Sequence, residues 1–395
     1  MSSKNRWLLP AGIEEVLPEN AAIIESTRRK CLDLFNVWGY QMVIPPLIEF
    51  LDSLLLGDCE DLDLQTFKVT DQMSGRTMGI HADMTPQVAR IEAHRLGAQA
   101  PSRLCYCDTV LHTLPESSGG TRSPMQIGAE LYGHTGLASD VEIIQLMETM
   151  LTQCGVNHIL MDLGHTGIVD TLIQQLALGK DFNQDFHSIV QRKSEPDMET
   201  LLSGIDASSE LKNACMQVIH CHGKADVLTR ARQQLNIPGT SIAEYLDYLE
   251  ELSQVLQTRL QATDLHFDLA ESRGYHYQQG VVFTAFCAHQ GQELARGGRY
   301  DNIGENFGRA RPATGFSADL KTLIEVSDDN IYSSNEGIFA PANDDPALLQ
   351  KVRELRAAGH TVVTGLDTDA EAVESENCTK ILVCENGQWM IKEKS

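Results

Sequence analysis

The amino-acid sequence predicts an α+β fold built around a largely antiparallel sheet. Helical and extended patterns do not alternate regularly along the chain, and hairpin signals are frequent. Residues 173–260 form a long helical stretch with few strand signals, whereas a parallel α/β sheet would require strands and helices in regular alternation. We therefore expect an antiparallel sheet with flanking helices, a helical insert and a small C-terminal α/β unit.

The first half of the chain contains most of the expected core elements. In chain order the patterns predict a helix over 19–38, an interrupted strand over 40–50, a hairpin over 66–80, a helix over 84–96, strands over 103–113 and 123–133, a helix over 140–154 and a strand over 158–164. Gly39 is a natural helix stop, and Pro45 with Pro46 interrupts the strand. Ser139 and Glu142 form a capping-box pattern before the third helix.

The second half begins with the helical insert, expected over about 173–260, after which strand patterns resume. A polar stretch then separates two expected domains, residues 1–326 and 336–395. In the second domain, Asp345 before a proline predicts a helix start. Asn386 followed by glycine predicts a tight hairpin turn near the end of the chain.

Composition limits the classes of partner. The 395 residues carry a formal net charge of -24, with 31 basic against 55 acidic side chains. Nucleic-acid binders need clustered lysine and arginine to replace counterions, so a large RNA ligand is disfavoured. A small zwitterion, or a protein with a basic face, fits this charge better.

Location follows from what the sequence does not contain. It has no run of 18 or more uncharged apolar residues, so no membrane span is expected, and its first 20 residues lack the apolar region of a signal peptide. Its 10 cysteines are scattered, which predicts reduced core thiols rather than a disulfide framework. We expect a cytoplasmic protein.

Two stretches in the first half offer candidate binding residues. Asp83 and Thr85 lie between a strand and a helix, where they could receive an ammonium group or simply cap the helix. Gln126 and Glu130 lie on one face of a strand, since side chains alternate with a period of two. That face could also be merely solvated.

Two further candidate stretches lie in the second half. Arg273 with Tyr275 and Tyr277 places a cation beside an aromatic wall, although cross-strand aromatic packing gives the same pattern. A glycine-rich loop that includes Arg299 and Tyr300 is weak evidence on its own. Together the four stretches supply two acids, a guanidinium, amides and tyrosines, which suits a zwitterion with a hydrogen-bonding side chain.

A cluster of histidine and cysteine resembles a metal site only superficially. His220, Cys221 and His222 follow one another near an expected helix end, and their spacing does not match structural zinc patterns. We expect neither a metal nor another cofactor.

These residues carry a family resemblance that extends over residues 9–326. In order, the segments 34–50, 81–86, 125–130, 272–283 and 297–308 resemble the signature stretches of the class II catalytic domain of histidyl-tRNA synthetases. The ordered set is specific, whereas each piece alone is not. The resemblance implies a class II aminoacyl-tRNA synthetase-like fold and a pocket for histidine.

The departures from that family fall on its ATP-binding residues. His112 stands where the family's second motif has the arginine that binds the α-phosphate, and Leu114 replaces a glutamate. Thr322 stands where the third motif has its ATP-clamping arginine. Neither histidine nor threonine can supply the planar, bidentate contacts of a guanidinium. The last 60 or so residues are also shorter than the family's anticodon-binding domain.

This combination resembles the branch of the family that serves as regulatory subunits of ATP phosphoribosyltransferase, the first step of histidine biosynthesis. The resemblance implies a non-catalytic subunit that dimerises, assembles with a short catalytic subunit (usually four plus four, a hetero-octamer), activates it and carries feedback inhibition by L-histidine. The histidine-binding residues that it implies are Asp83, Thr85, Gln126, Glu130, Arg273, Tyr275, Tyr277 and Tyr300.

Other classes of protein remain as alternatives. A functional histidyl-tRNA synthetase is disfavoured by His112, Thr322 and the acidity. A stand-alone histidine-binding module would need no partner. A synthetase-like modifier of another protein would also lack the two arginines.

Overall fold

The computed structural model describes residues 7–55, 60–115, 120–261, 263–271, 279–327, 337–366 and 378–394. The chain divides into two compact units, residues 1–329 and 330–395. Each unit has its own sheet and its own buried core.

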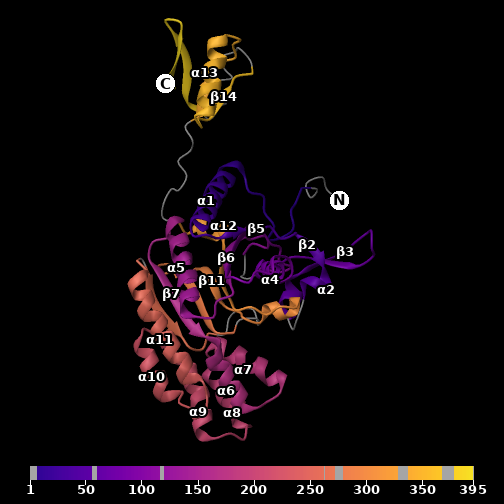
Figure 1. The fold of residues 1–395 in the computed structure, drawn as a ribbon, viewed down its shortest axis with the longest axis vertical. Coiled ribbons are helices and arrows are strands. Elements are labelled where there is room, and N and C mark those ends of the chain that lie inside the picture. The colour runs from indigo at the N-terminus through magenta and orange to yellow at the C-terminus, as the bar shows by residue number, and fades with distance from the viewer. Residues whose placement is uncertain are drawn as a thin grey trace. The chain divides into compact units, whose positions relative to one another are not determined.

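A nine-stranded sheet forms the centre of the larger unit (Figure 1). Its strand order is β1 (Gln41–Met42), β5 (Ser102–Thr109), β6 (Met125–Tyr132), β12 (Ala313–Asp319), β11 (Glu293–Arg299), β10 (Val281–Cys287), β7 (Ile159–His165), β9 (Thr263–Asp268) and β8 (His222–Gly223). The β1–β5 and β7–β9 pairs are parallel and the other six are antiparallel. The expected largely antiparallel sheet is confirmed.

The two faces of this sheet are covered differently. On one face lie α1 (Pro18–Val37), α5 (Leu137–Gln153) and α12 (Leu320–Glu325), and on the other α4 (Thr85–Ile91) with its π-helical continuation Glu92–Leu96 and a 3-10 turn, Ile303–Phe307. Alternate side chains of β5 point to these two faces. Cys105 and Cys107 face the α1 and α5 side, whereas Leu104 and Tyr106 face α4.

A three-stranded sheet lies beside α4. It contains β2 (Ile48–Phe50), β4 (Thr77–Ile80) and β3 (Phe67–Thr70), with the short helices α2 (Leu51–Leu54) and α3 (Glu60–Gln65) nearby in the chain. The hairpin turn between β3 and β4 contains Gly75 at φ +72°, a conformation that glycine adopts without steric cost. The predicted hairpin is confirmed.

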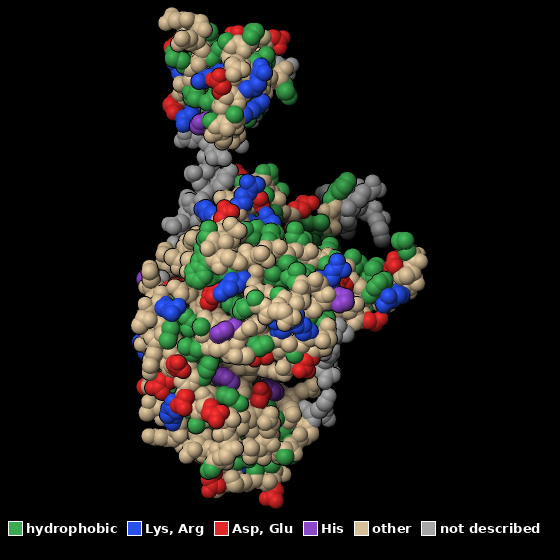
Figure 2. All heavy atoms as spheres, in the orientation of Figure 1, with side chains coloured by type: hydrophobic (Ala, Val, Ile, Leu, Met, Phe, Trp, Pro, Cys, Tyr) green, Lys and Arg blue, Asp and Glu red, His purple; other side chains and the backbone are tan. Residues whose placement is uncertain are grey.

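The expected helical region contains six helices and one short strand in its described part. The helices are α6 (Thr166–Leu176), α7 (Lys180–Arg192), α8 (Glu195–Ser203), α9 (Ser209–Val218), α10 (Asp226–Gln234) and α11 (Ile242–Arg259). α11 packs on α5, α6 and β7, which attaches the helices to the sheet. Figure 2 shows a hollow in the surface where this helical part meets the body of the unit.

One local prediction is wrong. Ser139 and Glu142 do not form a capping box, because α5 begins at Leu137 with Gly136 as its N-cap and no side-chain cap. The Ser139 hydroxyl donates to the Gly136 carbonyl at 2.8 Å. The Glu142 carboxylate is bound by Arg103 of β5, at 2.7 and 2.8 Å, so a long-range ion pair replaces the local cap.

The smaller unit is a four-stranded sheet with one helix. Its strand order is β14 (Val362–Thr364), β13 (Gly337–Ala340), β15 (Cys378–Glu385) and β16 (Gln388–Glu393). The helix α13 (Pro346–Ala357) starts as expected, since the Asp345 carboxylate accepts from Ala347 N at 2.9 Å. Asn386 and Gly387 both have positive φ in the tight β15–β16 turn, as predicted.

Two global expectations concern thiols and membranes. The cysteines in the described residues are all free, and all except Cys384 are buried. Among the helices of the described ranges, none is both long enough and apolar enough to cross a membrane.

Candidate functional site

Glu130 lies at the centre of a buried cluster of hydroxyl groups. Its Oε1 accepts from Thr85 Oγ1 at 3.1 Å and from Tyr106 OH at 3.0 Å, and its Oε2 accepts from Tyr300 OH. These donors come from α4, β5 and the end of β11, which the sheet order brings around β6. A carboxylate offers about four acceptor sites, so three hydroxyl donors leave one for a ligand N–H.

Burial sets the protonation of this carboxyl group. Glu130 is almost fully buried, and burial raises its pKa to about 8, against the lowering effect of the three hydroxyl hydrogen bonds. The nearby Asp83 charge also raises it. Glu130 can therefore either accept a hydrogen bond or donate one near neutral pH. Such a group can form a hydrogen bond with either nitrogen of a neutral imidazole, since one is a donor and the other an acceptor.

A second acidic residue lies at the other end of the cluster. Gln126 Nε2 donates to Asp83 Oδ1 at 2.9 Å, and Gln126 Oε1 accepts from Met84 N at 2.8 Å. Asp83 is buried, and its Oδ1 also accepts from Thr85 N at 3.3 Å. Asp83 therefore binds the first backbone N–H of α4, although the N-cap residue of that helix is Met84, which has no side-chain cap. Its carboxylate nevertheless shares one buried cluster with Gln126 and Glu130.

A cavity of about 360 Å³ adjoins the Gln126 end of this cluster. Both positions where the family resemblance implied a missing arginine line it, namely His112 and Thr322. The sheet therefore brings together two residues that are 210 positions apart in the sequence.

Each of these two residues is engaged by the protein itself. The His112 ring is buried, and its Nε2 donates to the Ala82 carbonyl at 2.8 Å. The Thr322 hydroxyl donates to Asp319 Oδ2 at 3.0 Å, within the first turn of α12. Asp319 is itself the N-cap of that helix. The two side chains are therefore structural here and present no guanidinium to a phosphate.

The cavity has little positive charge in its described lining. Arg296 is the one arginine or lysine there, and its Nε donates to Glu293 Oε1 at 2.6 Å. Glu293 and Asp319 contribute two carboxyl groups to the same lining. Binding of a triphosphate needs concentrated positive charge or backbone amide donors, so this lining disfavours ATP.

Five of the eight sequence-predicted histidine-binding residues come together in this cluster: Asp83, Thr85, Gln126, Glu130 and Tyr300. The other three, Arg273, Tyr275 and Tyr277, lie outside the described residues. Sequence reasoning did not include Tyr106 or Tyr132. The Tyr132 hydroxyl lies 3.5 Å from the Tyr300 hydroxyl.

The place of Tyr106 in the cluster follows from the register of two paired strands. Tyr106 lies opposite Gly128 in the β5–β6 pair. A side chain at residue 128 would overlap the Tyr106 ring, so glycine there admits the tyrosine to the cluster. That relationship needs the pairing of two strands, which the sequence alone does not fix.

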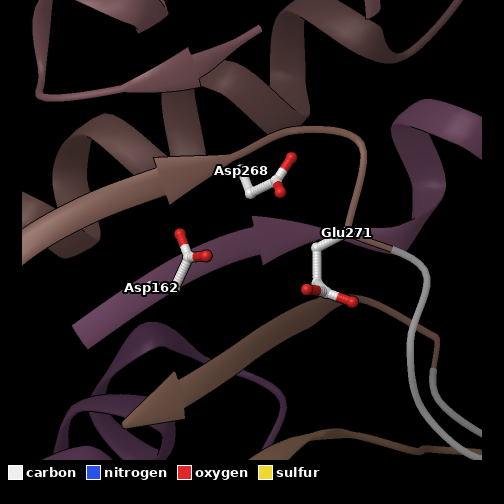
Figure 3. A group of neighbouring side chains, drawn as sticks. All are labelled: Asp162, Asp268 and Glu271. Atoms are coloured by element: carbon white, nitrogen blue, oxygen red, sulfur yellow. The ribbon is translucent and has the colours of Figure 1, made fainter. Parts of the chain in front are cut away.

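A group of three carboxylates lies at another edge of the sheet (Figure 3). Asp162, Asp268 and Glu271 each offer an oxygen within 4.8 Å of the others. Asp268 pairs with Lys193 Nζ at 2.5 Å, and Asp162 pairs with His266 Nδ1 at 3.0 Å, a hydrogen bond that raises the pKa of His266. A lysine and a histidine of the chain therefore already pair with two of the three carboxylates.

The histidine and cysteine cluster noted in the sequence does not converge on one point. His220 Nε2 lies 3.1 Å from Glu195 Oε1, and the Cys221 thiol points to Gln234 Oε1 at 3.7 Å. His222 is exposed on β8. The three side chains therefore make separate contacts.

The sequence matches two family models. Residues 12–323 match the model described as histidyl-tRNA synthetase. Residues 335–392 match the model described as the ATP phosphoribosyltransferase subunit HisZ C-terminal domain. Together the two models cover most of the chain.

Curated relatives match over their whole length. The chain is 49% identical over 394 residues to the ATP phosphoribosyltransferase regulatory subunit of Thioalkalivibrio sulfidiphilus, covering 100% of both chains. It is 47% identical over 392 residues to the protein of the same description from Pseudomonas fluorescens strain Pf-5, covering 99% of both. The expectation of a regulatory rather than catalytic subunit is confirmed by these relatives.

Solved structures share the fold. An ATP phosphoribosyltransferase regulatory subunit/histidyl-tRNA synthetase from Bacillus halodurans matches with a TM-score of 0.81 and 26% identity, covering 95% of this chain and 97% of that one. The histidyl-tRNA synthetase of Nostoc sp. PCC 7120 matches with a TM-score of 0.77 and 16% identity over 96% and 91%, which shows the fold alone. The class II synthetase-like fold is confirmed, and the chain belongs to the family of ATP phosphoribosyltransferase regulatory subunits.

Proposed function

We propose that this regulatory subunit binds L-histidine in the Glu130 cluster and, through it, mediates feedback inhibition of an ATP phosphoribosyltransferase catalytic subunit that it otherwise activates. The observation that carries the proposal is that two buried carboxyl groups, Glu130 and Asp83, lie in one hydrogen-bonded cluster. Histidine has a cationic ammonium and a hydrogen-bonding ring, and each finds a complementary partner in this arrangement.

The imidazole end is assigned to Glu130 with Tyr300. Glu130 has acceptor capacity left beyond its three hydroxyl donors, and its raised pKa of about 8 lets it serve either imidazole tautomer. The ammonium end is assigned to Asp83, Thr85 and Gln126. The carboxylate of the ligand is assigned to Arg273, with Tyr275 and Tyr277 beside it, by the family resemblance.

The assembly belongs to the same proposal. The catalytic partner is the short form of ATP phosphoribosyltransferase, in a hetero-octamer built on dimers of this chain. Tyr40 and the exposed edge strand β1 lie in the segment that resembles the family's dimer-forming motif. The net charge of -24 argues against tRNA as a ligand, and we place the complex in the cytoplasm, away from membranes.

A catalytic histidyl-tRNA synthetase is the alternative. Against it stand the internal bonds of His112 to Ala82 and of Thr322 to Asp319, together with the paired state of Arg296. Adenylate formation would need positive charge directed at the phosphates, whereas each of these side chains is bonded within the protein instead.

Calorimetric titration of L-histidine into the full chain, alone and in complex with the short catalytic subunit, tests the proposal. Glu130→Gln should weaken histidine binding by about 2 kcal/mol or more, since a desolvated partner is lost. Glu148→Gln, the same change at a buried carboxylate of α5 that binds Gln261 N and Thr263, is the control and should bind normally.

The enzymatic arm uses the same variants. The Glu130→Gln complex should retain phosphoribosyltransferase activity but lose inhibition by histidine. Wild-type affinity in Glu130→Gln would refute the pocket. Lost binding with full inhibition would refute the regulatory role and place the inhibitory site on the catalytic subunit.

A further inference from the structure

A second cavity lies at the junction of the sheet with the helical part of the larger unit. Its volume is about 360 Å³, within the range of small-molecule sites. The lining comes from α6, α11 and the ends of β7, β10 and β11, and none of its described residues also lines the cavity beside the Glu130 cluster. The hollow between the helical part and the body of the unit in Figure 2 lies at the same junction.

One wall of this cavity is aromatic. The His165 ring stacks on Tyr245, with centroids 4.2 Å apart and planes 16° apart, and Tyr248 meets His165 edge-on at 6.3 Å. Gly167 N donates to His165 Nδ1 at 3.1 Å, which leaves the proton of the neutral ring on Nε2. Burial lowers the pKa of His165 to about 4, so this wall is uncharged at neutral pH.

The aromatic wall is held in place by close packing. A Cβ on Gly167 would approach the Tyr245 ring to 2.7 Å, so only glycine lets the tyrosine lie against the start of α6. In this arrangement there is no room for a side chain at residue 167 beside the Tyr245 ring.

The cavity lining also contains a carboxylate. Asp170 of α6 lines it, and the Asp170 side chain keeps 43% of its surface exposed. Among the described residues, His187 lies beside it, with its Nε2 3.8 Å from Asp170 Oδ1, and this ring is charged only when protonated. Burial raises the pKa of Asp170 to about 6.

Arg299, the one arginine in the described part of the lining, does not neutralise Asp170. The Arg299 guanidinium donates to Asp140, Ser139, Asp301 and the His134 carbonyl. Its positive charge is therefore shared between two carboxylates, Asp140 of α5 and Asp301 just after β11. An anion entering the cavity would meet Asp170 without a free cation in the described lining.

We propose that this cavity binds a small planar cation, of the amidinium or protonated amino-heterocycle class, with its N–H groups on the Asp170 carboxylate and its ring against Tyr245 and Tyr248. A carboxylate and the faces of tyrosine rings both favour a cation, and an amidinium pairs with a carboxylate through two parallel hydrogen bonds. This site is separate from the histidine site and does not depend on it.

Three shape-matched probes test the charge requirement on the full chain. Benzamidine is the cation, benzamide the neutral control and benzoate the anion. Saturation-transfer NMR and calorimetry should detect benzamidine, with benzamide at least about tenfold weaker and benzoate undetectable. Equal binding of all three, or no binding of benzamidine at millimolar concentration, would overturn the proposal.

Variants locate the site. Asp170→Asn should weaken benzamidine about tenfold or more while leaving the thermal unfolding midpoint close to that of the wild type, since the side chain is partly exposed. Asp33→Asn, the same change on an exposed turn of α1, and Glu130→Gln should both leave benzamidine binding unchanged. Retained affinity in Asp170→Asn, or competition by histidine that Glu130→Gln abolishes, would refute the assignment.

Discussion

Arg299 and Tyr300 are consecutive residues that serve opposite faces of the nine-stranded sheet. The Arg299 guanidinium donates to Asp140 at 2.8 Å and to Ser139 at 2.9 Å, both in α5. The Tyr300 hydroxyl donates to Glu130 on the α4 side. Because one backbone segment carries both contacts, the buried ion pair on one face positions a hydroxyl of the candidate histidine site on the other.

The first prediction concerns this ion pair. Arg299→Met should lower the free energy of unfolding by about 3–5 kcal/mol, because it leaves the Asp140 charge buried without a partner. Adding Asp140→Asn should restore much of the loss. Urea denaturation at pH 7 measures both.

The control for that experiment is an exposed ion pair. Arg76 lies 3.2 Å from Asp52, with side chains 51% and 86% exposed, so Arg76→Ala should cost less than about 1 kcal/mol. A loss in Arg299→Met no larger than in this control would show that the buried pair does not stabilise the fold.

A second prediction follows from the pKa of Glu130. In the folded chain that pKa is raised to about 8, whereas an unfolded glutamate has a pKa of about 4.3. Between these values the folded state holds a proton that the unfolded state does not, so this group makes the protein less stable as pH rises. Below about pH 4 the destabilisation is absent.

Glu130→Gln isolates that effect. The free energy of unfolding of the wild type, relative to Glu130→Gln, should fall between pH 5 and pH 8 with a slope of at most about 1.4 kcal/mol per pH unit. Denaturant titrations of both proteins at pH 5, 6.5 and 8 measure it. Parallel pH profiles would mean that Glu130 is ionised throughout this range in the folded chain.

A third prediction concerns ATP. The full chain should show no histidine-dependent exchange between ATP and pyrophosphate, because His112 and Thr322 are bonded within the protein and Arg296 is paired with Glu293. A histidyl-tRNA synthetase assayed under the same conditions provides the positive control. Exchange clearly above the protein-free rate would contradict this assignment of the cavity.

The fourth prediction concerns self-association. Ile44 is 72% exposed between β1 and β2, and Met42 and Leu47 nearby are also exposed apolar residues. Such a group beside an edge strand fits a two-fold interface between identical chains. Ile44→Asp should convert a dimer into a monomer, as measured by light scattering at micromolar concentration. Leu178→Asp, an exposed apolar position after α6, should leave the mass unchanged.

The sequence predicted those elements whose determinants are local. Asn386 and Gly387 adopt the positive φ values that a tight hairpin requires, and Asp345 caps α13. The capping box at Ser139 failed because Arg103, far away in the chain, binds the Glu142 carboxylate. Local patterns cannot anticipate a competing long-range ion pair.

The residues of the candidate site likewise differ in whether local sequence identifies them. Asp83 and Glu130 were identified from short motifs, but the role of Tyr106 depends on its register with Gly128. The second cavity could not be predicted, because Asp170 and Tyr245 come from helices whose packing is set by tertiary contacts.

The glycine opposite Glu130 has a consequence for how the proposed feedback could be silenced. Gly315 pairs with Glu130 across β12 and β6, and a methyl carbon at residue 315 would overlap the Glu130 carboxylate. Gly315→Ala would therefore displace that carboxylate without altering the charge of the protein. A bacterium carrying this allele should continue to make histidine in its presence and excrete the surplus, while one with an alanine at the unobstructed Gly204 should not.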